Sequence, residues 1–166
     1  MPEAHQKTIK SYDLHGKSYD VPVDQVVWRP SAYAVVVRDG KLLLTRMHQA
    51  LHLPGGGLDM TEAPEAAAIR EVKEETGYTV TNPRLIDVES TFFTYDNLTA
   101  KRLTHNHSLL FFYQCDFVGG EPSIDGFEEY ERLHGDMPEW VSLADLDDIV
   151  AGSTFDWRQV VKKLYP

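Results

Sequence analysis

Short apolar runs bounded by turn residues predict several β-strands along the chain. The clearest are Ser31 to Arg38 and Lys41 to Arg46, which flank Asp39-Gly40, a pair that favours a two-residue hairpin turn. Further strands are predicted at Arg84 to Ser90 and at Ser108 to Val118. The last of these is apolar on both faces, so we expect a central strand that is buried on both sides.

One segment has the residue pattern of an α-helix. Pro64 suits a first helical position, because its φ angle is preset and its missing N–H would be unpaired there. Alanines that propagate helix well follow it, and Gly77 fits the left-handed residue that often ends a helix. We therefore predict a helix from Pro64 to about Thr76. Ala63 is a poor N-cap, so Thr61 is the alternative cap if the helix starts earlier.

Weaker signals lie near both ends of the chain. Tyr12 to Val21, turning at His15-Gly16, is predicted to form a hairpin. Helices are predicted at Leu143 to Val150 and at Asp156 to Leu164. The candidate caps of the last helix are Ser153 and Thr154. Strands with interspersed helices indicate an α/β sandwich around a mixed β-sheet.

Composition and charge narrow the class of protein. With 166 residues the chain is long enough for one domain with a sizeable core. The formal net charge of −10 disfavours binding to long nucleic acid or to an anionic membrane, and no run approaches the roughly 20 apolar residues of a membrane helix. Cys115 is the only cysteine, so an intramolecular disulfide is impossible. We expect a cytoplasmic protein in which Cys115 packs in the core.

Three carboxylates lie within five residues of the predicted helix. Glu71, Glu74 and Glu75 share an arc of roughly 100° around the helix axis, because residues three and four apart are neighbours. Arg70 lies beside Glu74 at i+4 and can orient it. Clustered like charges should destabilise the helix, so a divalent metal on this face would explain them. The alternative is the solvated acidic face of a surface helix, which is the usual meaning of a charge run.

The Gly55-Gly56-Gly57 run before the helix lets the backbone approach a ligand closely. Glycines and helix together resemble the Nudix box, which reads Gly, five residues, Glu, seven residues, Arg-Glu, an aliphatic residue, any residue, Glu-Glu, any residue, Gly and an aliphatic residue. The matching residues are Gly56, Glu62, Arg70, Glu71, Val72, Glu74, Glu75 and Gly77. Only Tyr78 departs, being aromatic at a packing position. The resemblance implies a Nudix-type α/β/α sandwich for residues 31–166. Residues 1–30 precede this domain as an extension, and we expect them to form a β-hairpin that packs on the domain or on a partner.

The resemblance also implies a reaction and a set of ligands. It implies hydrolysis of a nucleoside diphosphate linked to another group, with Mg²⁺, or alternatively Mn²⁺, as the cofactor. It implies Glu74 and Glu75 as metal ligands together with the Gly55 carbonyl, and Glu71 as a ligand or as the base for the attacking water. It implies that Arg70 holds a glutamate in place. Glu62, Gly56 and Gly57 are expected to support the loop.

Two parts of the site stay open at this point. In this family the general base often lies beyond the box, where the acidic residues are Glu121, Asp125, Glu128, Glu129, Glu131 and Asp136. For the substrate, Arg46 and Arg102 are candidates to bind terminal phosphates, and Tyr95 is a candidate to stack a base. Tyr95 lies seventeen residues past the box, a spacing similar to that of family members acting on dinucleoside polyphosphates. The alternatives are surface arginines and a tyrosine that packs in the core.

Two functional hypotheses from different classes remain. The first is a metal-dependent hydrolase with a small nucleotide-type substrate, and the second is a non-catalytic module that senses a nucleotide or ADP-ribose and regulates a partner. The complete set of glutamates favours the first. Alternating apolar residues in the extension, Tyr19, Val21 and Val23, predict a homodimer formed through it, because a short strand pair needs a surface to pack on.

Overall fold

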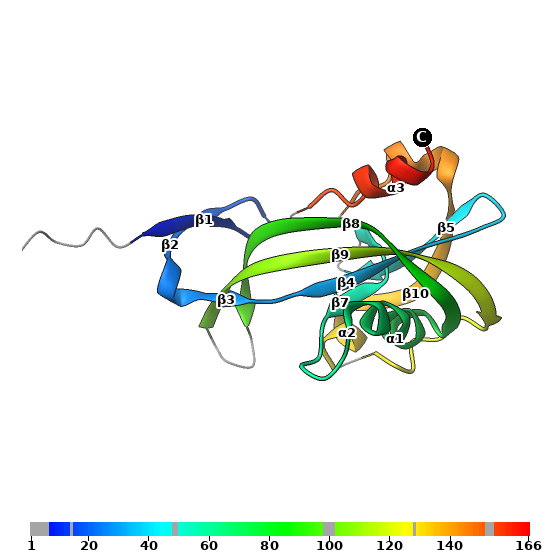
Figure 1. Cartoon of the computed structure of the whole chain (residues 1–166), viewed down its shortest axis with the longest axis horizontal. Helices are drawn as coiled ribbons and strands as arrows, with labels where there is room; N and C mark the ends of the chain where they lie inside the picture. Colours follow the sequence, from blue (N-terminus) through cyan, green and yellow to red (C-terminus); the bar gives the residue numbers. More distant parts are fainter. Residues whose placement is uncertain (1–6, 14, 48–49, 98–101, 128, 152–154) are drawn as a thin grey trace, which may run out of the picture.

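The structure is a computed structural model, and it describes residues 7–13, 15–47, 50–97, 102–127, 129–151 and 155–166. Its described strands form one mixed sheet whose path runs β10-β5-β4-β9-β8-β1-β2, with β3 paired to β9, β6 to β5 and β7 to β4 (Figure 1). The strands are β1 Thr8–Tyr12, β2 Ser18–Pro22, β3 Val26–Trp28, β4 Ser31–Arg38, β5 Lys41–Met47, β6 Ala50–His52, β7 Gly55–Gly57, β8 Tyr78–Asn97, β9 Arg102–Gly120 and β10 Gly135–Ser142.

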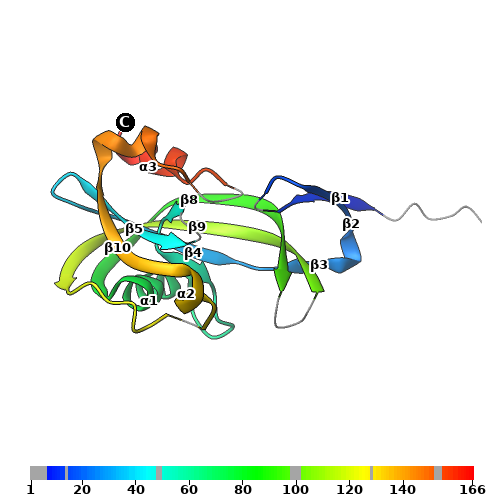
Figure 2. The same cartoon turned by 180° about the vertical axis from the view of Figure 1, so that it is seen from behind.

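The helical elements are α1 Pro64–Thr76, α2 Glu129–His134 and α3 Arg158–Leu164, with short 3₁₀ turns η1 Val23–Gln25 and η2 Leu143–Asp148. Figure 1 and Figure 2 show α1 and α2 on one side of the sheet and α3 on the other. The predicted α/β sandwich around a mixed sheet is therefore confirmed.

The central hairpin and the first helix form where the sequence predicts them. Asp39 and Gly40 have φ angles of 50° and 74°, the left-handed pair that a tight two-residue turn requires, and they join β4 to β5. Helix α1 spans Pro64–Thr76 and ends at Gly77, whose φ is 74°. Ala63 precedes the helix without a side-chain cap. The alternative start at Thr61 is therefore wrong.

Each face of the sheet has its own core. Ala67, Ala68 and Val72 of α1 pack with buried residues of β4 on one face. On the other face, Val160 and Val161 of α3 pack with buried residues of β4, β5 and β9. Two predicted helix bounds are corrected on this face: the segment from Leu143 is a 3₁₀ turn that ends at Asp148, and α3 begins at Arg158. The candidate caps Ser153 and Thr154 lie outside the described residues.

The two longest strands exceed their predicted lengths. β8 and β9 pair antiparallel from Tyr78↔Gly120 to Asn97↔Arg102, with register shifts near Thr81 that absorb the intervening residues. Their far half is stabilised by segments distant in sequence, because β3 pairs with β9 and β1 with β8. Local patterning carries no signal for such pairing, so the predicted strands were too short.

The first thirty residues contribute strands to the same sheet. β1 and β2 form an antiparallel hairpin in the register Thr8↔Pro22, so its first strand begins before the predicted Tyr12. The hairpin joins the sheet through Tyr12↔Phe93, and the Ser11 hydroxyl lies 2.7 Å from that of Thr94. In the described residues no helix is long and apolar enough to cross a membrane.

Candidate active site

Arg70 is the centre of an ion-pair network on α1. Its Nη1 donates to Glu71 Oε1 at 2.9 Å and to Glu74 Oε2 at 2.7 Å. Its Nε and Nη2 donate to both carboxylate oxygens of Glu62 at 3.0 and 2.6 Å, and Nη2 also donates to the Gly57 carbonyl at 3.2 Å. This planar fork lowers the pKa of Glu62 and raises that of Arg70. Arg70 thus ties the helix to the glycine segment and to the loop that follows it.

Glu71 and Glu75 are buried carboxylates, 8% and 6% exposed. Burial raises the pKa of Glu71 to about 7, with Arg70 opposing the shift and Glu74 and Glu131 adding to it. The pKa of Glu75 is raised well above its ordinary value by burial and then by the charge of Glu71. Glu75 Oε2 accepts a hydrogen bond at 2.9 Å from the Gly55 N–H, which offsets only part of the rise in the pKa of Glu75. Burial and the repulsion between the two carboxylates therefore disfavour the charged forms of Glu71 and Glu75 in the metal-free protein.

The glycines of β7 pack tightly against both the sheet and the helix. Gly55 has φ 151°, and a Cβ there would lie 2.3 Å from the carbonyl oxygen of Ala32. A Cβ on Gly56 would lie 2.7 Å from Glu71 Oε1. A side chain at either position would displace backbone or a site carboxylate, which explains why glycine is required here.

The side chains around Glu71, Glu74 and Glu75 show which ligands the site offers to a metal ion. In the described part of the chain no three carboxylate, imidazole or thiol side chains are grouped as a ready-made metal site. Arg70 donates hydrogen bonds to one oxygen of Glu71 and to one of Glu74. The donor chemistry fits a hard divalent cation, because Glu71 and Glu75 place carboxylate oxygens close together in a buried site where no cationic side chain among the described residues contacts Glu75.

Of the acidic residues beyond the box, Glu131 contributes by its charge to the raised pKa of both buried glutamates, Glu71 and Glu75. It lies on α2 and is half-buried. The other candidates that the structure describes are exposed: Glu121, Asp125, Glu129 and Asp136. Glu128 lies outside the described residues.

Close packing of the preceding loop places Glu131. The Ser123 N–H donates to the Thr76 carbonyl at 3.0 Å, and a Cβ on Gly126 would lie 2.5 Å from the Glu74 carbonyl oxygen. Arg132 then ties α2 to this loop by donating to the Phe127 carbonyl at 2.8 Å. The two contacts between this loop and α1 join segments more than forty residues apart, so the sequence could not single out Glu131 among six acids.

Comparison with known proteins gives the family. The profile of the NUDIX domain matches residues 28–163. The chain belongs to the Nudix family. A relative named RNA pyrophosphohydrolase, from Caulobacter vibrioides, is 30% identical over 142 residues, covering 77% of this chain and 80% of the relative. A relative named ADP-ribose pyrophosphatase, from Methanocaldococcus jannaschii, is 29% identical over 162 residues, covering 95% and 82%.

The fold agrees with solved Nudix structures. A NUDIX hydrolase from Nitrosomonas europaea matches with a TM-score of 0.63 at 19% identity, covering 84% of this chain and 89% of that one. The enzyme class predicted from the sequence, a Nudix-type pyrophosphohydrolase, is confirmed by the family and its named relatives. Nudix hydrolases generally use a divalent metal, which agrees with the donor chemistry of Glu71, Glu74 and Glu75.

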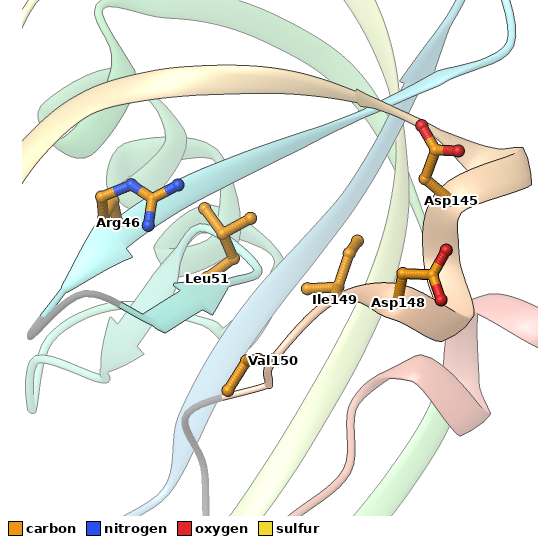
Figure 3. A pocket seen from close by; sticks show the side chains of 6 residues that line it. All are labelled: Arg46, Leu51, Asp145, Asp148, Ile149 and Val150. Atoms are coloured by element: carbon orange, nitrogen blue, oxygen red, sulfur yellow. The ribbon is translucent and has the colours of Figure 1, made fainter.

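The predicted phosphate ligand Arg46 lies on the face of the sheet opposite the Nudix helix. It is two residues beyond Leu44 on β5, and Leu44 packs on the α3 side. Its Nη2 lies 2.7 Å from Glu139 Oε1. Arg46 also lines a pocket of about 300 Å³, in which Figure 3 shows Asp145 and Asp148 of η2. The structure does not bring Arg46 together with the box, and its substrate role stays a prediction.

Tyr95 and Arg102 lie near the far end of the β8–β9 pair, which Figure 1 shows beside β3 and away from α1. The Tyr95 ring stacks on Phe93 with 5.5 Å between centroids, and Arg102 is exposed. Their substrate roles also stay predictions.

Two other groups that could have been functional take part in packing. His105 Nδ1 lies 2.8 Å from the Thr94 hydroxyl, and His107 Nε2 lies 2.8 Å from the Ser90 hydroxyl. Cys115 is buried, and burial raises the pKa of its thiol to about 11. The thiol is therefore neutral near pH 7, in agreement with a packing role.

We expect the metal-free protein to lose stability as the pH rises from about 4.5 to about 7. The pKa of Glu71 rises from 4.5 to about 7 on folding, so its contribution is fully present below the lower value and is lost as pH passes the upper one. Melting temperatures in chelator at several pH values would measure this. Glu71→Gln should flatten the decline, and an unchanged decline would contradict the assignment.

Proposed function

We propose that the chain is a Mg²⁺-dependent hydrolase, with Mn²⁺ as an alternative metal, that cleaves the diphosphate linkage of a nucleoside diphosphate bonded to another group. The observation that carries this is the cluster of buried carboxyl groups, Glu71 and Glu75, beside Glu74 within the Nudix box. A diphosphate is anionic, so this acidic site would repel it unless a cation lay between them.

The three glutamates would hold the cation together with the Gly55 carbonyl. When bound, it would neutralise phosphate oxygens and make a bound water more acidic. Arg70 orients Glu71 and Glu74 through its hydrogen bonds and reduces the repulsion between these two carboxylates. The side-chain-free surface of β7 allows phosphate groups to approach the backbone closely.

Glu131 supplies the base in this proposal. Its charge already acts on Glu71 and Glu75, so a water molecule held by the cluster lies within its influence. A carboxylate from a separate element can accept the proton of the attacking water while the box glutamates keep their charge for the cation.

We expect Glu131→Gln to lower kcat by about 100-fold with little change in KM, because general-base catalysis contributes a factor of this order. The matched control is Glu129→Gln on the same helix, whose side chain is exposed. Steady-state kinetics of both variants would decide. Equal losses in the two variants would assign the base to another residue.

Two substrate classes are supported by named relatives. Some relatives are named ADP-ribose pyrophosphatase, and others RNA pyrophosphohydrolase. Internal RNA linkages are phosphodiesters, so a pyrophosphate bond in RNA can lie only at a terminal phosphate group. The net charge of −10 disfavours contact with a long RNA body, which favours the small nucleotide.

A substrate panel tests the proposed function. ADP-ribose, dinucleoside polyphosphates, nucleotide sugars, nucleoside triphosphates and a short 5′-triphosphorylated RNA would each be incubated with Mg²⁺, with Mn²⁺ and with chelator. We expect hydrolysis of at least one small nucleotide, dependent on metal and absent in Glu74→Gln. Tight binding of a nucleotide without any turnover across the panel would favour the sensing module instead.

The homodimer remains a prediction. It is supported by exposed hydrophobic residues in the N-terminal extension. Tyr12, Val23, Val27 and Trp28 are large hydrophobic residues between 45% and 64% exposed. A second copy would cover them. Light scattering should give about twice the 18.9 kDa chain mass, and a single chain mass at high protein concentration would rule the dimer out. The cytoplasmic location is likewise kept as a proposal.

A further inference from the structure

A row of polar side chains on β9 lacks hydrogen-bond partners. Thr104, Asn106 and Ser108 occupy alternate positions, so they share one face of the strand. The Thr104 hydroxyl, the Asn106 amide nitrogen and the Ser108 hydroxyl are all buried and without a partner. Asn106 and Ser108 are each only 2% exposed. The same alternation continues to Leu110 and Phe112, which pack under α3, so the row lies on the face opposite α1.

Three unsatisfied groups in one row are unusual. Buried polar atoms in native proteins nearly always have a partner, and leaving one unmade is unfavourable. A chance defect would affect one atom, whereas here three alternate residues on one face of the strand each carry an unsatisfied group. We therefore expect these three side chains to form hydrogen bonds with polar groups of a ligand.

Arg29 lies beside this row. β3 and β4 follow β9 in one continuous register, Trp28↔His107 and Ser31↔Leu110, which places Arg29 opposite Ser108. Arg29 Nη1 donates to the Ser31 hydroxyl at 2.9 Å. The ion pairs found among the described residues do not include Arg29, so its charge is free to meet an anion.

The glycine strand connects this row to the Nudix box. A Cβ on Gly57 would lie 3.3 Å from Arg29 Nη2, and the Gly57 carbonyl accepts a hydrogen bond from Arg70. The neighbouring residue, Gly56, faces Glu71 on the other side of the sheet. β7 pairs only with β4 among the described strands and carries no side chains, so a ligand can extend past it from the glutamates to Arg29.

Aromatic rings flank the row on β8. Phe93 pairs with Asn106 and Tyr95 with Thr104, so both share its face. Their rings stack with 5.5 Å between centroids and an interplanar angle of 18°. Stacked rings beside amide and hydroxyl donors are the combination that binds a nucleobase with its sugar.

We propose that Thr104, Asn106 and Ser108 form the subsite for the nucleoside part of the substrate, and that Arg29 holds the phosphate next to it. This inference rests on the proposed function, in which the diphosphate lies at the Nudix glutamates. Phe93 and Tyr95 provide the stacking surface, and the donors of the row select a nucleoside by its acceptor groups.

Nucleoside monophosphates test the subsite directly, because they lack a diphosphate linkage and are not consumed. Calorimetry with AMP, GMP, CMP and UMP in the presence of Mg²⁺ should identify a preferred nucleotide. Ser108→Ala and Asn106→Ala should each weaken its binding by about tenfold, the effect of one lost hydrogen bond. Inorganic phosphate should bind all proteins alike.

The matched control is Ser90→Ala, which removes a hydroxyl from the other face of the same strand pair, where it contacts His107. Ser108→Ala removes an unsatisfied group, so its melting temperature should equal or exceed that of the wild type, which separates lost binding from lost folding. Wild-type nucleotide affinity in Ser108→Ala and Asn106→Ala would overturn the subsite. Selective nucleotide binding without hydrolysis of any panel substrate would support the subsite and overturn the proposed function.

Discussion

Glu74→Gln is expected to lower kcat by roughly 100-fold or more, the loss expected when a charged metal ligand becomes neutral. The change keeps the shape of the side chain, so the loss would come from the missing charge. Glu74 has a 43% exposed side chain, and its ion pair is with Arg70, which keeps Glu62 and Glu71 as partners. The fold should therefore survive, and melting curves would show this.

Glu65→Gln is the matched control for this prediction. Glu65 lies nine positions before Glu74 on the same helix, which places it about 180° around the axis, and it is exposed. It should keep nearly full activity. Near wild-type turnover by Glu74→Gln at saturating Mg²⁺ would remove Glu74 from the site.

Arg70→Ala is expected to destabilise the metal-free protein by about 2 kcal/mol, which lowers the melting temperature by about 5 °C for a chain of this size. The variant leaves the carboxylates of Glu62, Glu71 and Glu74 without their shared cation. The expected loss lies below the roughly 3–5 kcal/mol of a fully buried ion pair because the Arg70 side chain is 29% exposed. Mg²⁺ should restore part of the loss.

Arg84→Ala is the control for Arg70→Ala, because it shows how much stability is lost when an ordinary surface ion pair is removed. Arg84 binds Asp116 at 2.6 Å, but both side chains are more than 40% exposed, so Arg84→Ala should lower the melting temperature far less than Arg70→Ala does. Arg70→Lys should behave like Arg70→Ala, since an ammonium group cannot reproduce the planar fork. Equal losses in the Arg70 and Arg84 variants would contradict a central role for Arg70.

Local chemistry made the helix and its carboxylates predictable. Pro64 and Gly77 mark the two ends of α1 through backbone preferences that act within one or two residues. Asp39-Gly40 fixes a hairpin for the same reason. The arc shared by Glu71 and Glu75 follows from helix geometry alone, and the structure adds that both are buried.

Features that depend on distant contacts could not be predicted. Glu131 reaches the cluster because a loop packs on the end of α1, and nothing in its immediate sequence distinguishes it. The segment 129–134 was not predicted as a helix for the same reason. Two patterns in the sequence do indicate which side chains share a face of the sheet. The alternation of Leu44 and Arg46 indicates a shared face of β5, and the polar residues 104, 106 and 108 alternate within one strand.

Titration of Mn²⁺, followed by electron paramagnetic resonance, tests the central claim that the Nudix glutamates hold a divalent metal. Wild-type protein should bind Mn²⁺, and Mg²⁺ should compete with it. Glu74→Gln and Glu75→Gln should each weaken binding by at least about tenfold, while Glu65→Gln should bind as the wild type does. Equal Mn²⁺ affinity in all four proteins would contradict the account.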